Sequence, residues 1–158
     1  MDDRTALESA VIADVQALSA ESDQIGRVFA GVHELSANDF RALVHVMVAE
    51  NAGTPLTAGE LRSRMGMSGA AITYLVERMI ISGHLRRESD PADRRKVILR
   101  YAQHGIDVGR AFFGPLADHT HRALADLSDD DLAAAHRVFT AVLAAMGGFR
   151  TELSAPDG

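Results

Sequence analysis

The sequence predicts a mainly α-helical chain in which one small β-hairpin separates two groups of helices. Apolar residues recur every three or four positions over most of the chain, as they do in amphipathic helices. Three helix-starting pairs place a hydroxyl residue three positions before an acidic one. These pairs are Ser36 with Asp39, Thr57 with Glu60, and Ser128 with Asp131. The helical period is lost between Gly83 and Ala102, where two stretches that can be extended flank the charged segment DPADRR.

Length and composition set limits on the class of protein. The chain has 158 residues, 47% of them hydrophobic, which is enough for one ordinary globular domain with a core. It has no cysteine, which excludes disulfides, thiol catalysis, zinc–thiolate fingers and cysteine redox sensing. No apolar run approaches the roughly 20 residues that span a bilayer, and the first residues carry acids where a signal peptide carries bases. We therefore expect a cytoplasmic protein with no membrane partner.

The N-terminal third predicts a long helix and then a shorter one. The apolar positions of the long helix are Leu7, Val11, Val15, Leu18, Ile25, Val28, Phe29 and Val32. The second helix starts at the Ser36 pair and carries its apolar face on Phe40, Leu43, Val44 and Met47. The turn residues NAGTP end it.

The middle of the chain predicts a helix-turn-helix. Thr57 opens a short helix that runs through Met65, and Gly66 breaks it. A second helix begins at Ser68, and Gly83 stands where a residue is needed to stop it. Two helices joined by a tight turn with a glycine make a helix-turn-helix, and a hairpin directly after them makes it a winged helix.

The C-terminal part returns to helix. One helix is expected from about Gln103 to Ala125, with Pro115 as a candidate kink. The last helix starts at Ser128. The first and last helices are long for one small domain, so their apolar faces need a partner, either each other or a second subunit.

The charge of the chain is unevenly distributed. The formal net charge is −6, but residues 60–100 carry nine basic and five acidic residues, hence +4, and the remainder carries −10. Local charge decides where a polyanion docks, so the basic middle indicates a nucleic-acid partner. Of the 16 basic residues, 15 are arginine. Arginine suits phosphate and base recognition, but a GC-rich genome would explain this bias equally well.

The segment LVERMIISGHLRRESDPADRRKVIL resembles the MarR family of bacterial transcription regulators. Asp90, Asp93, Arg94 and Arg95 match its D-x-x-D-R-R wing signature, and the order of elements agrees over nearly the whole chain. The resemblance implies a ligand-responsive repressor that binds a pseudo-palindromic operator as a homodimer, with recognition helices about 34 Å apart. It divides the chain into an N-terminal dimerisation helix (1–34), a winged helix-turn-helix DNA-binding domain (35–101), C-terminal dimerisation helices (102–150) and a loose tail (151–158).

The charged wing is the first candidate DNA contact. A long cation at the tip of a hairpin can enter the minor groove, where the negative potential is focused. The expected wing contacts are Asp90, Asp93, Arg94, Arg95 and Lys96, in which the bases contact DNA and the acids orient them. The resemblance implies that Arg95 enters the groove, while Arg94 is held by an aspartate or lies on a phosphate.

The helix after Ser68 is the second candidate contact, because the N-terminal part of a recognition helix enters the major groove. The expected contacts are Ser68, Gly69, Ala71, Thr73, Tyr74 and Arg78, with Ala70 or Ala71 facing a thymine methyl. Many family members carry arginine where this chain has Tyr74, so base preference is open. Packing of Tyr74 beside the wing is an equal alternative. For Arg78, an ion pair with Glu77 or a wing acid is an alternative slightly favoured over a base contact.

Effector binding follows only from the resemblance, which implies a pocket for a small aromatic ligand between the dimerisation helices and the winged helix. The candidate lining residues are Phe29, His33, Met47, Phe112 and Phe113, although apolar residues at helical spacing are usually plain core. We expect no metal, because His119 and His121 are two positions apart and do not share a helix face.

Catalysis has no support in the sequence. It has no nucleotide-binding glycine loop, no G-x-S-x-G and no H-E-x-x-H, so we expect neither an enzyme nor a cofactor. The main alternative is a winged helix that serves as a protein-interaction module without specific DNA binding, which the net charge of −6 allows. The second alternative is an enzyme that turns over a phenolic ligand on a helical dimer.

Overall fold

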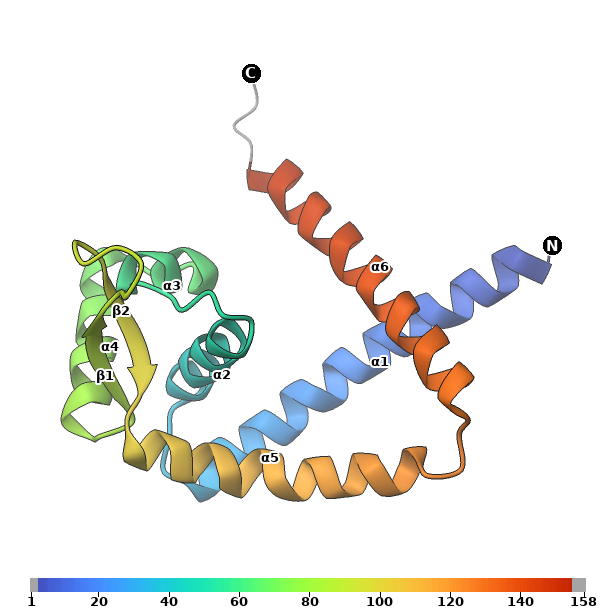
Figure 1. Cartoon of the computed structure of the whole chain (residues 1–158), viewed down its shortest axis with the longest axis horizontal. Coiled ribbons are helices and arrows are strands. Elements are labelled where there is room, and N and C mark those ends of the chain that lie inside the picture. Colours follow the sequence, from blue (N-terminus) through green and yellow to red (C-terminus); the bar gives the residue numbers. More distant parts are fainter. Residues whose placement is uncertain (1–2, 155–158) are drawn as a thin grey trace. The chain divides into compact units, whose positions relative to one another are not determined.

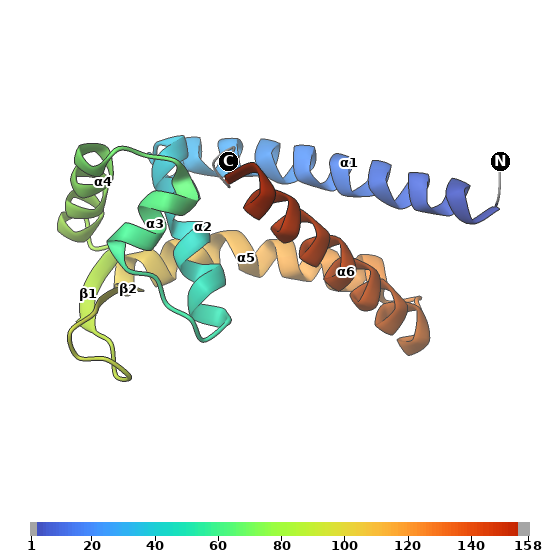
Figure 2. The same ribbon diagram turned by 90° about the horizontal axis from the view of Figure 1, so that it is seen from above.

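A computed structural model describes residues 3–154, which form six helices and one two-stranded sheet (Figures 1 and 2). The elements in chain order are α1 (Asp3–Val32), α2 (Ala37–Asn51), α3 (Ala58–Met65), α4 (Gly69–Ile81), β1 (Leu85–Ser89), β2 (Val97–Tyr101), α5 (Gln103–Leu124) and α6 (Asp129–Ser154). The prediction of a mainly α-helical chain with a β-hairpin wing is confirmed. The described part divides into two compact units, with the boundary inside α5, between Gly114 and Pro115.

The predicted helix starts are confirmed. At α2 the Ser36 hydroxyl accepts a hydrogen bond from the Asp39 amide at 3.1 Å, and the Asp39 carboxylate accepts one from the Ser36 amide at 3.1 Å. Thr57 and Glu60 make the same reciprocal bonds at α3, as do Ser128 and Asp131 at α6. Each pair satisfies amides that the first turn of a helix leaves without partners, which fixes where the helix begins.

Two glycines shape the helix-turn-helix. Gly66 has φ 64° and ends α3, while Gly83 has φ 75° and follows α4. A side chain is strained in this left-handed conformation, so the chain reverses direction most easily at glycine. The tight turn at Gly66 brings the last turn of α3 beside the first turn of α4.

The wing is an antiparallel hairpin in which Leu85 lies opposite Tyr101 and Ser89 opposite Val97. A third segment joins it, because Thr57 forms a bridge with Ile98 and the Leu99 amide donates to the Leu56 carbonyl at 2.7 Å. This segment was not predicted from the sequence, since one bridged residue leaves no alternating pattern. It connects the start of α3 to the wing.

The core of the winged helix lies where α2, α3, α4 and the hairpin meet, on the left of Figure 1. Its largest fully buried side chains are Leu61, Met79, Leu85, Ile98, Leu99, Val46 and Val76. Burying each such side chain contributes roughly 1.5–3 kcal/mol, which holds the helix-turn-helix and the wing together as one body. The start of α5 belongs to this core through Val108, so the compact unit extends beyond the expected boundary at residue 102.

The two longest helices leave most of their surface exposed in the single chain. In α1, a helix of 30 residues, only Gly26 and Ala30 are buried. The described part of α6 has no buried residue, and it exposes Val138, Phe139, Leu143, Met146, Phe149 and Leu153. These faces are the ones that the sequence analysis expected to need a partner.

The last helix corrects two expectations. By length and composition alone, α6 is apolar enough to cross a membrane, whereas no continuous apolar run of that length was expected from the sequence. The apolar positions of α6 are interrupted by polar ones, which is why no continuous run stood out. The helix also continues through Ser154, so the first part of the expected tail at residues 151–158 is helical. Residues 155–158 lie outside the described residues.

Candidate nucleic-acid interface

The tip of the wing is a closed turn. The Lys96 amide donates to the Asp93 carbonyl at 2.8 Å, and the Asp90 amide donates to the Lys96 carbonyl at 3.0 Å. The Asp90 carboxylate accepts from the Ala92 amide at 2.8 Å, as aspartate does at the start of many turns. Figure 2 shows this tip extending past α2 and α3. The role of Asp90 is therefore to shape the turn, and the expectation that it orients a wing arginine is wrong in this respect.

Asp93 holds Arg95. One oxygen of the Asp93 carboxylate accepts from the Arg95 backbone amide at 3.1 Å and from its Nε at 3.2 Å. These two bonds hold the pKa of Asp93 below its usual value, the backbone bond having the larger effect. The side chain of Arg95 stays 92% exposed, so the carboxylate fixes the base of the guanidinium and leaves its outer nitrogens free. Arg94 has no ion pair with an aspartate within residues 3–154, which leaves the phosphate contact as its expected role.

Several basic residues of the stretch 60–100 form ion pairs at the root of the wing. Arg87 donates to Glu77 of α4 at 2.6 Å, which ties the first strand to the recognition helix. Arg100 pairs with Glu50 of α2 at 3.2 Å. Within residues 3–154, four cations of the basic stretch form no ion pair, namely Arg62, Arg64, Arg94 and Lys96. These four and the tip of Arg95 are the charges available to a polyanion.

The candidate recognition helix α4 buries one face and exposes the other. Its buried residues are Ile72, Leu75, Val76 and Met79, as the periodicity predicts. Its N-terminal half exposes Gly69, Ala70, Thr73 and Tyr74. Ala71 is half-buried, so the alanine that faces outward is Ala70.

Several polar groups of α4 already have partners inside the protein. The Ser68 hydroxyl caps the helix by accepting from the Ala71 amide at 3.2 Å. The Thr73 hydroxyl donates to the Gly69 carbonyl at 2.8 Å. Arg78 forms an ion pair with Asp39 of α2, and its guanidinium carbon lies 5.4 Å from the centre of the Tyr74 ring. The alternative that Arg78 is in an ion pair is right, but the partner is neither Glu77 nor a wing acid.

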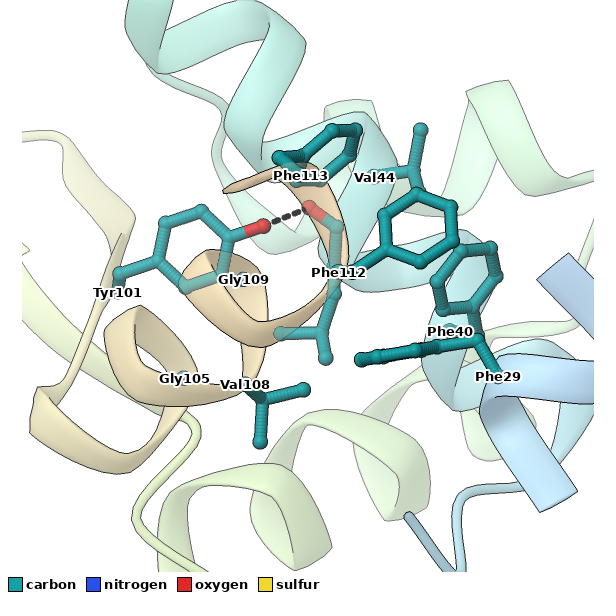
Figure 3. Close-up of a pocket in the computed structure, with 10 residues that line it drawn as sticks. Phe29, Phe40, Val44, Tyr101, Gly105, Val108, Gly109, Phe112 and Phe113 are labelled. Atoms are coloured by element: carbon teal, nitrogen blue, oxygen red, sulfur yellow. Dashed lines mark hydrogen bonds between the residues drawn. The ribbon is translucent and has the colours of Figure 1, made fainter. Parts of the chain in front are cut away.

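The aromatic residues proposed for an effector site form a packed cluster. Figure 3 shows the rings of Phe29, Phe40 and Phe112 against one another, with centres 4.6–5.7 Å apart. Phe29, Phe112 and Phe113 line a cavity of about 10 Å³. Of the other candidates, His33 stacks on Phe29, while Met47 is not among the lining residues. A cavity of this size holds about one water molecule, so an aromatic ligand needs the cluster to open.

A buried histidine, which the sequence pattern did not predict, lies at the root of the wing. His84 is 6% exposed, its Nδ1 lies 2.7 Å from the Ser82 hydroxyl, and its Nε2 has no partner within residues 3–154. Its ring lies 4.3 Å from the ring of His104. Burial and then the neighbouring His104 lower the pKa of His84, and Asp39 opposes them. Among the described residues, no group of three or more side chains could hold a metal ion.

Together, the fold and the basic hairpin define a winged helix-turn-helix protein. A model of the MarR family matches residues 33–96, from just after α1 to the wing tip. The chain is 33% identical over 82 residues to the HTH-type transcriptional regulator YcgE of Bacillus subtilis (strain 168), a match that covers 52% of this chain and 53% of that protein. The chain thus matches about half of the length of that relative. Over this segment the chain is similar to the MarR family and to an HTH-type transcriptional regulator.

Solved structures agree in fold over a larger part of the chain. A MarR family protein from Bacillus stearothermophilus superposes with a TM-score of 0.64 at 22% identity, covering 93% of this chain and 99% of that one. A mutant of MepR from a multidrug resistant S. aureus clinical isolate superposes with a TM-score of 0.66 at 14% identity, covering 84% and 94%. A structure of S. aureus MepR in complex with DNA gives 0.52 at 15% identity, covering 83% and 96%. At these identities the likeness shows the fold.

Proposed function

We propose that this chain is a cytoplasmic DNA-binding transcription regulator that contacts the minor groove with its wing and the major groove with α4. The observation that carries the proposal is the wing tip, where Asp93 holds Arg95 by its base and leaves the end of the guanidinium exposed. An arginine presented in this way is suited to the narrow, strongly negative minor groove. The family match and the DNA complex of MepR, a protein of the same fold, support the same reading.

The unpaired cations support a phosphate track beside the wing. Arg64 lies on α3, while Arg94 and Lys96 lie at the wing tip. The pKa of Glu60, at the start of α3, is lowered mainly by its bonds to Thr57, with Lys96 and Arg64 adding to the effect. Arg64, in the last turn of α3, and Lys96, at the wing tip, thus both act on the Glu60 carboxylate. Each phosphate contact that they make adds to the salt dependence of binding.

The proposed working form is a homodimer on a pseudo-palindromic operator, and the proposed role is repression relieved by a small aromatic effector. The uncovered apolar faces of α1 and α6 support a second copy as the partner. The aromatic cluster supports an effector only if it opens, because its cavity of about 10 Å³ is too small for a phenolic ring. Effector release is tested by adding phenolic compounds to a preformed protein–DNA complex.

The deciding experiment is fluorescence anisotropy with the intergenic duplex beside the protein's own gene and a random duplex of equal length. We expect the wild type to prefer the intergenic duplex and to bind it less tightly as salt rises. Arg95→Ala should lower the affinity about 10-fold or more. Arg122→Ala removes the same charge from the exposed surface of α5 and should bind like the wild type. No preference over random DNA at low salt would favour a protein-interaction module.

A further inference from the structure

The recognition helix of this chain has few free groups for reading bases. The hydroxyl of Ser68 caps the helix, and that of Thr73 is bonded to the backbone of its own helix. The guanidinium of Arg78 is paired with the buried Asp39, and Glu77 is paired with Arg87. Sequence discrimination in the major groove depends on free donors and acceptors. Ser68 therefore keeps its own O–H as a donor and Thr73 keeps only acceptor capacity, and apart from Tyr74 the rest of the exposed N-terminal half of α4 offers Gly69 and the methyl group of Ala70.

An arginine from α3 lies beside the N-terminal end of α4. Arg62, in the last turn of α3, places its Nη1 3.8 Å from where a Cβ on Gly69 would lie. Its side chain is exposed and has no ion pair within residues 3–154. Its backbone is fixed, because its carbonyl accepts from the Gly66 amide and, at 3.2 Å, from the Met67 amide. The absence of a side chain at Gly69 leaves space for the guanidinium beside the helix start.

We propose that Arg62 is the specificity-determining arginine of this chain and reads a guanine edge in the major groove from beside α4. The inference rests on the proposed DNA-binding function. The start of a recognition helix is the part that enters the major groove, so a guanidinium beside Gly69 reaches the base edges there. The fork of an arginine matches the O6 and N7 acceptors of guanine, which is the commonest specific contact between proteins and DNA.

The chain offers a matched control on the same helix. Arg64 lies two positions after Arg62, and residues at this spacing do not share a helix face. The charge of Arg64 helps to lower the pKa of the half-buried His45 of α2, after burial and Arg41. Arg64→Gln therefore removes the same charge from the same exposed helix, but at a site directed away from Gly69.

The test is a selection from duplexes randomised over about two helical turns, which span both half-sites of a dimer. The proteins compared are the wild type, Arg62→Gln, Arg62→Lys and Arg64→Gln. We expect both changes at Arg62 to lower the preference for guanine at one symmetric position of each half-site about 10-fold or more, with the other positions unchanged. Arg62→Lys should lose the guanine preference as Arg62→Gln does, because lysine keeps the positive charge but lacks the planar, two-pronged guanidinium of arginine. Arg64→Gln should keep every base preference and weaken binding uniformly.

Each contrary outcome has a distinct meaning. If Arg62→Gln selects the same sequence as the wild type and only binds more weakly, Arg62 contacts phosphate and the inference is overturned, while the proposed function stands. If Arg62→Lys restores the guanine preference, charge alone suffices and the inference is likewise overturned. If the wild type itself selects no sequence, the proposed function as a sequence-specific DNA-binding regulator is contradicted, and the inference about Arg62 is contradicted with it. Equal thermal melting of all four proteins ensures that a changed profile reflects recognition and not folding.

Discussion

At the scale of the residue, single carboxylates in this chain serve two purposes at once. Asp39 caps α2 with one oxygen and pairs with Arg78 of the recognition helix through the other. Asp93 binds both the backbone and the side chain of Arg95. In each case a residue that the sequence marks as a helix start or a turn also sets the direction of an arginine. Such second roles follow from tertiary placement, which spacing along the chain does not encode.

The stability of the protein should depend on pH through His84. Burial and His104 lower its pKa in the folded state, so the unfolded chain binds a proton at higher pH than the folded one. The stabilisation by neutral His84 is thus complete above the ordinary value near 6.5 and is lost as the pH falls below it. We expect the free energy of unfolding to decrease from about pH 7 to about pH 5 in urea titrations.

A variant isolates this contribution. His84→Gln keeps a group that can bond Ser82 but does not titrate, so the decrease between these pH values should be smaller than in the wild type. Part of the decrease should remain, because burial also lowers the pKa of His45. An equal decrease in both proteins would show that His84 does not couple protonation to folding.

At the scale of the element, the sequence predicts most of the fold because its local signals agree. The capping pairs and Gly66 and Gly83 mark real helix ends, and the loss of helical period marks a real hairpin. The partner of Arg78 could not be predicted, since Asp39 lies 39 residues away and meets it only after α2 packs against α4. The sequence allowed candidate DNA contacts to be placed on α4 and on the wing. It did not indicate Arg62, because Arg62 lies on α3 and comes close to Gly69 of α4 only in the folded chain.

The packing of α5 on the wing root should depend on Gly105. A Cβ at this position would lie 2.1 Å from the His84 carbonyl oxygen, a distance that forces the helix or the backbone to move. We expect Gly105→Ala to lower the free energy of unfolding by roughly 1–3 kcal/mol, as overpacking does elsewhere. A Cβ at Gly109, one turn later, would have no atom within 4 Å. Gly109→Ala should therefore leave the free energy of unfolding unchanged or raise it slightly. Equal urea midpoints for the two variants would contradict this account.

At the scale of the whole molecule, the exposed apolar residues of α6 need an explanation that one chain does not supply. Met146 is 57% exposed and Phe149 is 60% exposed. Large apolar patches on a protein usually mark a surface that another protein or a membrane covers. A second copy would cover them and would also set the spacing of two recognition helices, so we propose the dimer as the occupant.

The dimer should therefore be sensitive to charge on one side of α6. We expect Met146→Glu to shift the protein toward monomer in sedimentation equilibrium, because the interface would bury an unpaired carboxylate. Arg137→Glu lies nine positions earlier, on the opposite side of the helix, and should leave the association unchanged. If the wild type is instead monomeric and sediments with lipid vesicles, the apolar face of α6 binds a membrane and the dimer proposal is contradicted.

The central claim, that Asp93 aims Arg95 at DNA, is tested most directly by Asp93→Asn. Charge alone predicts that removing an acid from a DNA-binding surface tightens binding. Our account predicts the opposite sign, because asparagine weakens the hold on the guanidinium and the ordered arginine tip is lost. The measurement is the anisotropy of the intergenic duplex titrated with the wild type, Asp93→Asn and the control Asp118→Asn on α5. Weaker binding by Asp93→Asn alone supports the account, whereas equal or tighter binding contradicts it.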